Sequence, residues 1–492
     1  MFTHFSPSLT TDFTDIRRGI IGQGHTLHTH GHPDGIPLLY ADWTASGRAY
    51  GPIETTIRER ILPLMANTHT DTNTTGSAMT QAYEAARRVI RGHVNAAAGD
   101  VLICTGSGMT AAVNKLQRLI GVKQDFGRVP ERRPVIFVTH MEHHSNHTSW
   151  LETGAEVVLV ACNDRGLVCP EQFARAVAAY PDSRPRYAAI TACSNVTGIE
   201  TPYRAIAEIM HAAGGYCFVD FACSAPYVDL DMHPAERPLA YLDAVYFSPH
   251  KFLGGPGSCG VLVVNEAVLA SAVPDHPGGG TVAWTNPWGQ HRFLADREAR
   301  EDGGTPAILQ TIRAALAMRL KDRMGTARIR RQENRLMSIL WAGLDDIPQV
   351  NVLAGEHRER LGIVSFTIDG LHHNLAVKLL NDHYGIQVRG GCSCAGTYGH
   401  HLLNIDREAS DRTLAAIDDG RAFVRPGWVR LSIHPTMSGA EITYLLRAIG
   451  AVAANHHRWA ADYVLCPESA AVRCVDGRQD RRSRRDVEAI FA

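Results

Sequence analysis

Short apolar runs alternate with helix-like spacing of apolar residues along the middle of the chain. The runs have the length of buried strands, and the segments between them repeat apolar residues at helical spacing. Strands that alternate with helices favour a mostly parallel sheet with helices on both faces. The predicted strands are residues 101–104, 135–139, 156–160, 187–192, 216–220, 243–247 and 260–264, and the predicted helices are residues 110–120, 170–179 and 202–213.

The C-terminal part repeats this alternation on a smaller scale. A loop rich in Gly, Pro and Trp is expected at 266–304, and a long arginine-rich helical pattern at 305–342. The elements expected after it are strands at 363–368, 386–389 and 428–433 and helices at 374–382 and 438–453. We therefore expect an α/β protein with an N-terminal arm (1–37), a large domain (38–320), a small C-terminal domain (321–466, with contributions from the N-terminal segment) and a loose polar tail (467–492).

Composition and charge narrow the class of protein. The 492 residues are 45% hydrophobic and 20% charged, as in ordinary globular proteins, and a formal net charge of −1 argues against a general binder of nucleic acid or of anionic membranes. No apolar run approaches the roughly 20 residues of a membrane span, and Met1–Thr14 lacks a signal-peptide pattern. The 11 cysteines are scattered, so we expect free thiols and a cytoplasmic protein. The histidines between His25 and His32 suggest a metal site, but their irregular spacing argues against one.

One lysine stands out by its position. Lys251 follows the strand predicted at 243–247 and the small hydroxyl residue Ser248, and it precedes the glycine-rich turn at 254–257. A lysine that performs covalent chemistry needs partial desolvation and a fixed approach, and such a site supplies both. Most lysines are solvated surface charges, so the position of Lys251 alone is weak evidence for a catalytic role. The stronger evidence comes from the polar residues that follow the other strands.

Two other strand ends carry candidate binding groups. Glycines at 106 and 108 open the helix predicted at 110–120, where backbone N–H groups and the helix dipole favour an anion such as phosphate. A flexible turn with a helix cap is the alternative. Asp220 ends an apolar strand, and a buried carboxylate there needs a cationic partner. The glycine loop lacks both common nucleotide-binding spacings, which argues against a nucleotide-binding protein.

These segments, in their order along the chain, resemble the fold-type I pyridoxal phosphate (PLP) enzymes, in particular the cysteine desulfurase-like (SufS-like) branch of the class V aminotransferases. The resemblance spans roughly residues 15–455 and implies the family's fold, with a large PLP-binding domain and a small C-terminal domain. It implies that Lys251 binds the cofactor covalently and that Asp220 pairs with the protonated ring nitrogen. The further residues that it assigns to the cofactor are Gly108, Met109, Thr110, Ser248 and His250 around the phosphate, His143 over the ring, and Asn195 at the phenolic oxygen.

Two further residues match cofactor-binding positions of the family, one with a different residue type and one that acts across a subunit interface. Cys223 stands where the family usually has Gln or His, three residues after the aspartate. Thr305, in the run Gly303–Pro306, matches a threonine that in the family reaches the phosphate of the neighbouring subunit. The resemblance therefore implies a homodimer.

The segment from Arg389 to Cys394 indicates the type of reaction. Aligned on Arg389, Cys394 occupies the persulfide-forming position of the desulfurases, while Cys392 and Ser393 replace two histidines. The Cys-x-Cys form also resembles the desulfurase domain of molybdenum cofactor sulfurases. A thiolate is needed for attack on sulfur, and Arg389 and loop amides favour one. The alternatives are a buried structural thiol and zinc binding by the two cysteines with His400 or His401, and two cysteines alone make a poor zinc site.

The remaining matches concern the substrate. Arg430, in a predicted strand, matches the arginine that binds the substrate α-carboxylate, a role suited to a planar guanidinium. Arg389, Ala45 in the segment 40–46, and Asn67 match residues that face the substrate in the family.

Together these matches imply a PLP-dependent cysteine desulfurase-like enzyme. Lys251, helped by His143, takes the α-proton, Cys394 takes the sulfur of L-cysteine, and a protein or small-molecule acceptor collects it. The alternatives are a class V aminotransferase, an epimerase or a C–S lyase acting on another amino acid. A non-catalytic scaffold with the same fold is disfavoured because Lys251, Asp220 and Arg430 are all present.

Overall fold

The structure is a computed structural model, which describes residues 13–68, 70, 72–123, 133–477 and 484–492. Its chain forms two compact units. Unit 1 comprises residues 1–44, 195–198 and 327–492, and unit 2 comprises residues 45–194 and 199–326. The division into an arm, a large domain and a small domain that the sequence suggests stays a prediction.

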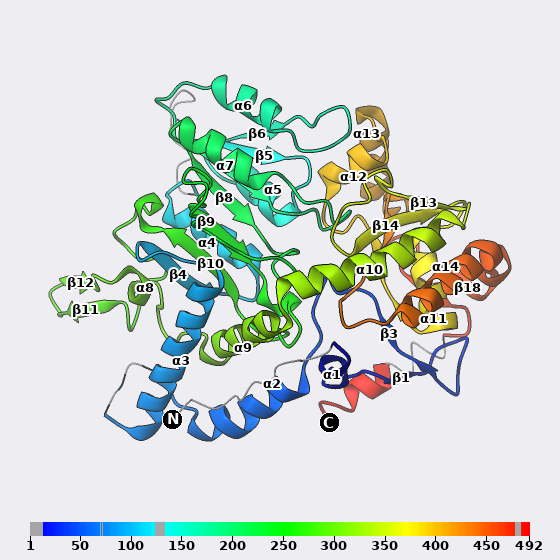
Figure 1. The fold of residues 1–492 in the computed structure, drawn as a ribbon, viewed down its shortest axis with the longest axis horizontal. Coiled ribbons are helices and arrows are strands. Elements are labelled where there is room, and N and C mark those ends of the chain that lie inside the picture. The colour runs from blue at the N-terminus through cyan, green and yellow to red at the C-terminus, as the bar shows by residue number, and fades with distance from the viewer. Residues whose placement is uncertain (1–12, 69, 71, 124–132, 478–483) are drawn as a thin grey trace. The chain divides into compact units, whose positions relative to one another are not determined.

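Unit 2 is built on a seven-stranded sheet in the order β4-β10-β9-β8-β7-β5-β6 (Figure 1). All neighbouring pairs are parallel except those of β10, which runs antiparallel to β4 and to β9. The strands are β4 (Asp100–Thr105), β5 (Val135–Thr139), β6 (Glu156–Val160), β7 (Arg186–Thr191), β8 (Tyr216–Asp220), β9 (Ala244–Phe247) and β10 (Gly260–Asn265). This is the mostly parallel sheet that the apolar runs predict.

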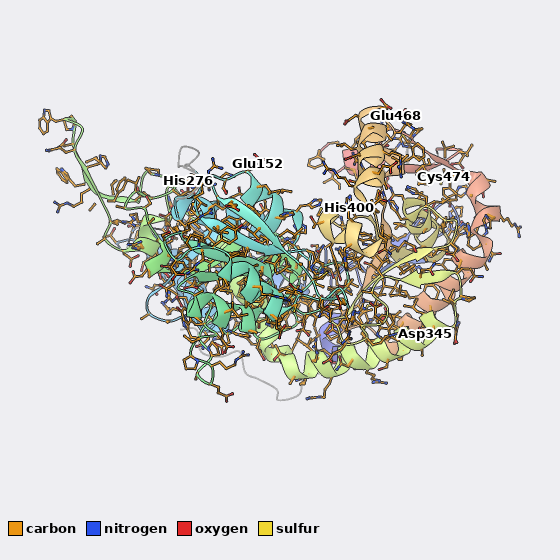
Figure 2. The ribbon with its side chains drawn as sticks, turned by 90° about the horizontal axis from the view of Figure 1, so that it is seen from above. Glu152, His276, Asp345, His400, Glu468 and Cys474 are labelled. Atoms are coloured by element: carbon orange, nitrogen blue, oxygen red, sulfur yellow. The ribbon has the colours of Figure 1, made fainter. Side chains whose placement is uncertain are left out.

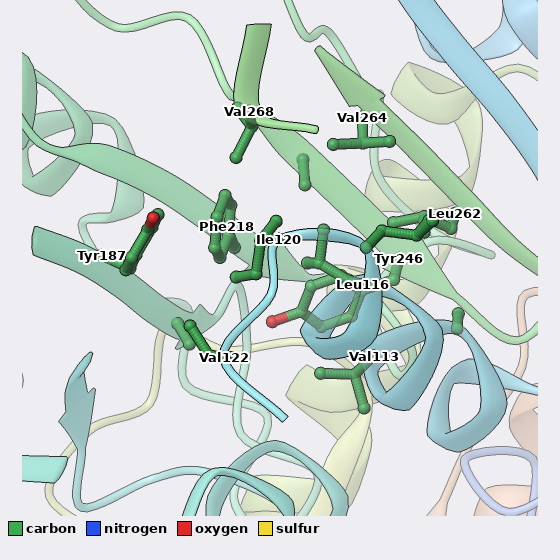
Figure 3. Packing of buried hydrophobic residues seen from close by; sticks show 14 of the residues in the cluster. Val113, Leu116, Ile120, Val122, Tyr187, Phe218, Tyr246, Leu262, Val264 and Val268 are labelled. Atoms are coloured by element: carbon green, nitrogen blue, oxygen red, sulfur yellow. The ribbon is translucent and has the colours of Figure 1, made fainter. Parts of the chain in front are cut away.

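One face of this sheet is covered by the helix that follows β4. Helix α4 (Met109–Leu119) carries apolar residues at helical spacing, and they join the sheet's side chains in one buried cluster. Figure 3 shows Leu116 and Ile120 lying against Phe218 and Tyr246 of the sheet. At roughly 25 cal/mol per Å² of apolar surface removed from water, this burial is the main force that places the N-terminus of α4.

The opposite face is covered by the helices between later strands. Phe173 of α6 contacts Phe137 of β5 with ring centroids 5.8 Å apart, and α7 packs on β7 and β8. Because the neighbours Ile136 and Val138 point into the α4 cluster, side chains alternate between two buried faces. The other helices of unit 2 are α2 (Gly51–Thr56), α3 (Thr74–His93), α5 (His144–Leu151), α6 (Pro170–Ala178), α7 (Tyr203–Ala212), α8 (Arg297–Arg300) and α9 (Ile308–Met324).

Two expectations about the end of unit 2 are wrong. The segment 266–304 is not all loop, because β11 (Val282–Thr285) and β12 (His291–Phe293) pair as an antiparallel hairpin. The long helical pattern at 305–342 is not one helix. It breaks at Gly325, whose φ of +74° only glycine adopts readily, between α9 and α10 (Thr326–Asp345).

Unit 1 contains a four-stranded antiparallel sheet in the order β13-β14-β17-β16. Its strands are β13 (Val350–Val352), β14 (Ile363–Ile368), β16 (Arg389–Gly391) and β17 (Trp428–Ser432). Helices α11 (His373–Tyr384) and α14 (Gly439–Trp459) pack together, and α11 contacts β14, β16 and β17. The smaller elements are α1 (Phe13–Arg18), α12 (Gly396–Leu402), α13 (Arg407–Asp418), β1 (Thr26–Leu27) paired with β2 (Ile36–Pro37), and β3 (Leu39–Tyr40) paired with β15 (Ile386–Gln387).

The short segment 195–198 lies in unit 1 although the chain on both sides of it lies in unit 2. Ser365 Oγ donates a hydrogen bond of 2.7 Å to Val196 O, and Leu361 N donates one of 2.9 Å to Gly198 O. A Cβ at Gly198 would lie 2.6 Å from Leu361 O, so the close approach requires glycine. These contacts place Asn195 beside the residues of unit 1.

The expectation of a loose extension after Pro467 is also wrong in part. Strand β19 (Val472–Cys474) pairs antiparallel with β18 (Tyr463–Leu465). The Cys474 side chain, labelled in Figure 2, is buried with its Sγ 3.5 Å from Asp382 Oδ2. The basic residues at 478–483 lie outside the described residues.

Within the described part of the chain, no helix has both the length and the apolar character that a membrane crossing requires.

Candidate active site

Lys251 lies in a tight turn at the end of β9. It closes the 3₁₀ helix η4 (Pro249–Lys251), and its backbone N–H donates to Ser248 O at 3.0 Å. The turn is tightly packed, since a Cβ at Gly255 would lie 1.9 Å from Pro249 O. Gly47 N donates to His250 O at 3.0 Å and ties a second loop of unit 2 to the turn. The lysine is therefore held on a rigid strand end.

Asp220 is a buried carboxylate beside this lysine. It ends β8, and its Oδ1 accepts a hydrogen bond of 2.7 Å from Ala222 N. Burial raises the pKa of Asp220 to about 6, while that hydrogen bond and the charge of Lys251 hold it lower. Burying a carboxylate in this way costs free energy unless a cation joins it. The site thus favours a positively charged group next to Asp220.

The glycine loop before α4 packs against the residues preceding Lys251. Ser248 Oγ accepts a hydrogen bond of 2.9 Å from Met109 N, and a Cβ at Gly108 would lie 3.0 Å from Ser248 Oγ and 3.6 Å from the His250 ring. Burial and the charge of Lys251 lower the pKa of His250 to about 4, so its ring is neutral at pH 7. The structure therefore brings these predicted phosphate residues together around the N-terminus of α4.

Thr110 and Cys223 make contacts that the sequence does not reveal. The Thr110 and Ser145 hydroxyl groups lie 2.6 Å apart, which joins the starts of α4 and α5. The Cys223 thiol is buried and donates to Cys193 O at 2.9 Å. Its partner in this structure is thus a backbone carbonyl.

His143 caps helix α5. Its Nδ1 accepts a hydrogen bond of 3.1 Å from Ser145 N, so in the neutral ring the proton lies on Nε2. The backbone of His143 is thereby fixed next to a helix start, and the ring remains partly exposed.

The burial of the acid next to His143 is a feature that the sequence does not reveal. Glu142 accepts hydrogen bonds of 2.7 Å from Thr139 Oγ1 and from Asn146 Nδ2, and Asn146 Oδ1 in turn accepts one of 2.6 Å from Tyr246. Burial raises the pKa of Glu142 to about 8, against the lowering effect of its hydrogen bonds, and the charge of Asp220 adds to the rise. Glu142 therefore holds a proton at neutral pH, and it lies close enough to Asp220 to feel its charge.

Replacing Glu142 with glutamine should flatten the pH dependence of stability in the cofactor-free protein. A carboxyl whose pKa is raised by folding contributes stability fully below its unfolded pKa and loses it as the pH rises through the folded pKa. For Glu142 the window runs from 4.5 to about 8. Between about pH 5 and about pH 9, the free energy of unfolding should fall more for the wild type than for Glu142→Gln, by on the order of a few kcal/mol. Urea denaturation across this range measures it.

The control for this prediction is Glu152→Gln. Glu152 is exposed at the end of α5, as Figure 2 shows, and this variant should keep the wild-type pH profile. Identical profiles for the wild type and Glu142→Gln would mean that Glu142 ionises like a surface carboxyl.

Two of the remaining predicted residues of unit 2 meet each other. Asn67 Nδ2 donates a hydrogen bond of 3.4 Å to Thr305 Oγ1, and the Thr305 side chain is exposed. Ala45 begins unit 2 and is partly exposed. Their assignments to substrate and to a neighbouring subunit stay predictions.

In unit 1, both candidate substrate arginines bind one carboxylate. Arg430 of β17 and Arg389 of β16 stand directly opposite each other, a pairing that like charges alone would disfavour. Asp42 lies between them: its Oδ1 is 3.0 Å from Arg430 Nη2 and its Oδ2 is 3.0 Å from Arg389 Nε and Nη2. The Arg430 side chain is 4% exposed and that of Arg389 is 51% exposed. Arg430 is thus the desolvated, rigidly held guanidinium of the two.

Asn195 connects Arg430 to the cysteine segment. Its backbone O accepts a hydrogen bond of 3.2 Å from Arg430 Nη1, and its Nδ2 donates one of 2.7 Å to Ser393 O. Trp428 Nε1 donates to Ser393 Oγ at 3.2 Å. The assignment of Asn195 to the cofactor stays a prediction. In this structure the Asn195 amide holds the loop that carries Cys394.

Histidines in both candidate metal sites, the one near Cys394 and the one at His25–His32, lie within hydrogen-bond distance of protein oxygen atoms. In the zinc alternative, His400 Nδ1 lies 2.8 Å from Gly396 O and Nε2 lies 2.9 Å from Ser410 Oγ, so both ring nitrogens are used. Of the N-terminal histidines, His28 Nδ1 lies 2.9 Å from Pro33 O and His32 Nε2 lies 2.9 Å from His383 O. No disulfide joins the cysteines, all of which fall in the described residues.

Comparison with known proteins finds one matching family and curated relatives that are named cysteine desulfurases. The model of the aminotransferase class-V family matches residues 39–445. Curated relatives include a probable cysteine desulfurase of Halalkalibacterium halodurans, 29% identical over 372 residues, and a cysteine desulfurase of an Enterobacter species, 29% identical over 366 residues. Each of these matches covers 74% of this chain and 85% of the relative.

Solved structures share the fold. The apo cysteine desulfurase of Thermococcus onnurineus superposes with a TM-score of 0.73 and 24% identity, covering 90% of this chain and 98% of the other. The cysteine desulfurase CsdA of Escherichia coli, in an S-sulfonic acid form, superposes with a TM-score of 0.68 and 21% identity, covering 89% and 98%. These likenesses confirm the α/β, fold-type I architecture that the sequence predicts.

Proposed function

The chain belongs to the aminotransferase class-V family, and from this premise we propose that it is a PLP-dependent cysteine desulfurase. It converts L-cysteine to L-alanine and takes the sulfur onto one of its own cysteines. The observation that carries the proposal is the role of Asn195 in unit 1. This residue binds both the buried Arg430 and the loop of Cys394, so a carboxylate-binding group and a candidate sulfur-accepting thiol are held together.

The residues of unit 2 fit the cofactor. A buried carboxylate with a raised pKa at Asp220 suits the protonated ring nitrogen, and the N-terminus of α4, with Gly108 close to Ser248, suits a phosphate. Lys251 would hold the aldehyde carbon, and Met109, Thr110 and His250 would complete the phosphate site. When bound, PLP supplies an electron sink that makes the substrate Cα–H bond acidic.

Three residues of unit 2 hold or move protons in the proposed reaction. Asp220 would hold the ring nitrogen of bound PLP and would favour its protonated form, because a cation there relieves the cost of the buried carboxylate. Lys251 Nζ, at a fixed strand end, removes the proton from the substrate Cα. His143, with its Nδ1 engaged by Ser145 N, has Nε2 as the ring atom that exchanges a proton with substrate.

The residues of unit 1 bind and orient the amino acid. The Arg430 guanidinium holds the substrate α-carboxylate, and Asp42 keeps that guanidinium in position. Arg389, which shares Asp42 and is half exposed, adds positive charge near the entering carboxylate and near the Cys394 loop.

The sulfur step balances without any further reagent. Cys394 Sγ, as a thiolate, attacks the substrate sulfur. The substrate Cβ–S bond breaks, a S–S bond to Cys394 forms, and the carbon fragment gains a proton and leaves as alanine. The net reaction is L-cysteine and a thiol giving L-alanine and a persulfide on Cys394. An acceptor then removes the sulfur.

Replacing Cys394 with alanine should abolish desulfuration, because no sulfur-accepting thiol remains at that position. We expect alanine formation from L-cysteine to fall by at least about 10²-fold, while the visible absorption of bound PLP is unchanged. Amino-acid analysis and sulfide determination in the presence of a thiol reductant measure the effect. Cys466→Ser, which changes a partly buried thiol near Glu468, is the control with wild-type rates.

Full alanine and sulfide formation by Cys394→Ala would contradict the persulfide role. It would instead favour a C–S lyase that releases sulfide directly from the substrate. Conversion of other L-amino acids at higher rates than L-cysteine would favour the aminotransferase or epimerase alternatives.

Two finer points belong to the same proposal. The exposed Thr305, which contacts Asn67, supports a homodimer in which this threonine serves the neighbouring subunit's phosphate. The 11 cysteines, none joined in a disulfide, support a reducing, cytoplasmic setting.

A further inference from the structure

The Cys-x-Cys segment forms a tight turn of a defined type. Ala395 N donates a hydrogen bond of 3.1 Å to Cys392 O, which closes a four-residue turn. The two central residues, Ser393 and Cys394, have φ of +52° and +56°. Positive φ at both central positions defines a type I′ turn. Neither residue is glycine, so the chain holds Cys394 in a backbone conformation that L-residues seldom adopt.

This turn places the two thiols within reach of each other. Two residues of fully extended chain span at most about 7 Å, and the turn shortens the separation of the Cys392 and Cys394 Cα atoms below that value. Disulfides join Cα atoms that are about 4.4–6.8 Å apart. The backbone therefore needs no large movement for a bond between the two sulfur atoms.

The residue between the cysteines is anchored, and the cysteines are not buried. Ser393 is held through its backbone O by Asn195 and through its Oγ by Trp428. Cys392 and Cys394 are both exposed, whereas the other cysteines in the described residues are buried or partly buried. The turn is thus a fixed platform with two accessible thiols.

Resting on the proposed function, we propose that Cys392 is the resolving thiol for a persulfide on Cys394. The Cys392 thiol loses its proton, and its sulfur attacks Cys394 Sγ. The bond between Cys394 Sγ and the outer sulfur breaks, and the outer sulfur takes up a proton and leaves as hydrosulfide. The outer sulfur is reduced, and the two cysteines are oxidised to a Cys392–Cys394 disulfide. Atoms and electrons balance with no external oxidant.

The product of the site is then free hydrosulfide rather than sulfur passed by direct contact. The disulfide leaves Cys394 unable to accept sulfur again, so each subunit stops after one turnover. A thiol reductant, such as a small dithiol or a dithiol protein, reopens the site. Turnover is thereby tied to the supply of reducing thiols.

A first experiment needs no cofactor. Ellman's reagent added to the cofactor-free protein should place one mixed disulfide on the turn, and the second cysteine should displace it. The wild type should release two equivalents of thionitrobenzoate in the fast phase and keep no adduct at residues 392–394. Cys392→Ser should release one equivalent and keep the adduct on Cys394. Peptide mapping by mass spectrometry locates the adduct. A lasting adduct on the wild-type turn would overturn the proposal.

A second experiment uses the PLP-loaded enzyme with L-cysteine and no reductant. The wild type should form one alanine and one sulfide per subunit, and its peptide should lose the two thiol hydrogens of Cys392 and Cys394. Cys392→Ser should form one alanine, release no sulfide and keep one extra sulfur atom on Cys394. Cys466→Ser should behave as the wild type.

The outcomes separate this proposal from the proposed function. Absence of alanine from the wild type would refute the desulfurase function itself. Alanine with a lasting persulfide on wild-type Cys394, or with the extra sulfur on Cys392, would leave the desulfurase function standing and overturn the resolving role.

Discussion

Lys251→Ala protein should lose both PLP attachment and turnover. We expect no visible absorption band from a lysine-bound cofactor, and alanine formation from L-cysteine lower by at least about 10²–10⁴-fold. The reason is that Lys251 closes a tight turn at the end of a strand, beside the buried Asp220. Absorbance titration with PLP and an alanine assay measure the two effects.

Borohydride reduction gives a second readout on the same residue. In the wild type, reduction should fix the cofactor to the peptide that carries Lys251, and mass spectrometry should find it there. Lys123→Ala, which changes a lysine in the loop after α4, is the control and should keep the band, the tagged peptide and the activity. Tagging of another lysine in folded, PLP-supplied wild type would contradict the assignment.

Arg430→Ala should weaken substrate binding and destabilise the fold at once. Loss of a charge-assisted contact to the α-carboxylate should raise KM for L-cysteine by roughly 10- to 100-fold. The change also removes the buried partner of Asp42, whose remaining ion pair with Arg389 is half exposed. Removing one member of a buried pair costs about 3–5 kcal/mol. Steady-state kinetics and urea denaturation measure the two effects.

The double variant Asp42→Asn/Arg430→Ala separates these effects. Neutralising Asp42 removes the unpaired charge, so much of the lost stability should return, while KM should stay high because the carboxylate-binding group is still missing. Arg412→Ala is a surface control, since Arg412 forms an exposed pair with Glu408. Recovery of a wild-type KM in the double variant would show that Arg430 does not bind the substrate carboxylate.

The buried strands of unit 2 could be predicted closely from the sequence. The bounds expected for β5, β6 and β8 agree with the structure, and those of β7 and β9 differ by one residue at one or both ends. Strands of a mostly parallel sheet are covered on both faces, so they appear as compact apolar runs. The predicted ends of α6 and α7 also lie within one residue of those in the structure, because each helix carries an apolar stripe on one side.

The β11–β12 hairpin and the break at Gly325 were not predictable in this way. The hairpin strands are largely exposed, with Trp284 and Trp288 facing solvent, so they lack the buried pattern that marks the other strands. Gly325 lies between two helical sequence patterns. Helix α9 ends there because Gly325 adopts a positive φ, which the sequence pattern does not reveal. The hairpin β18–β19 was likewise not predictable, because each of its strands has only three residues.

The sequence by itself determined the fold class and supplied the candidates for the main chemical groups. Lys251, Asp220 and Arg430 are candidates because each follows or lies in an apolar strand, and Cys394 is a candidate because of its place after Arg389. Only the tertiary structure decided which charges share a partner and which acid is desolvated. Asp42 reaches Arg389 and Arg430 across more than 340 positions of the chain, and Glu142 gains its raised pKa from burial. Such pairing and burial arise from packing between distant segments, and local residue patterns carry no record of them.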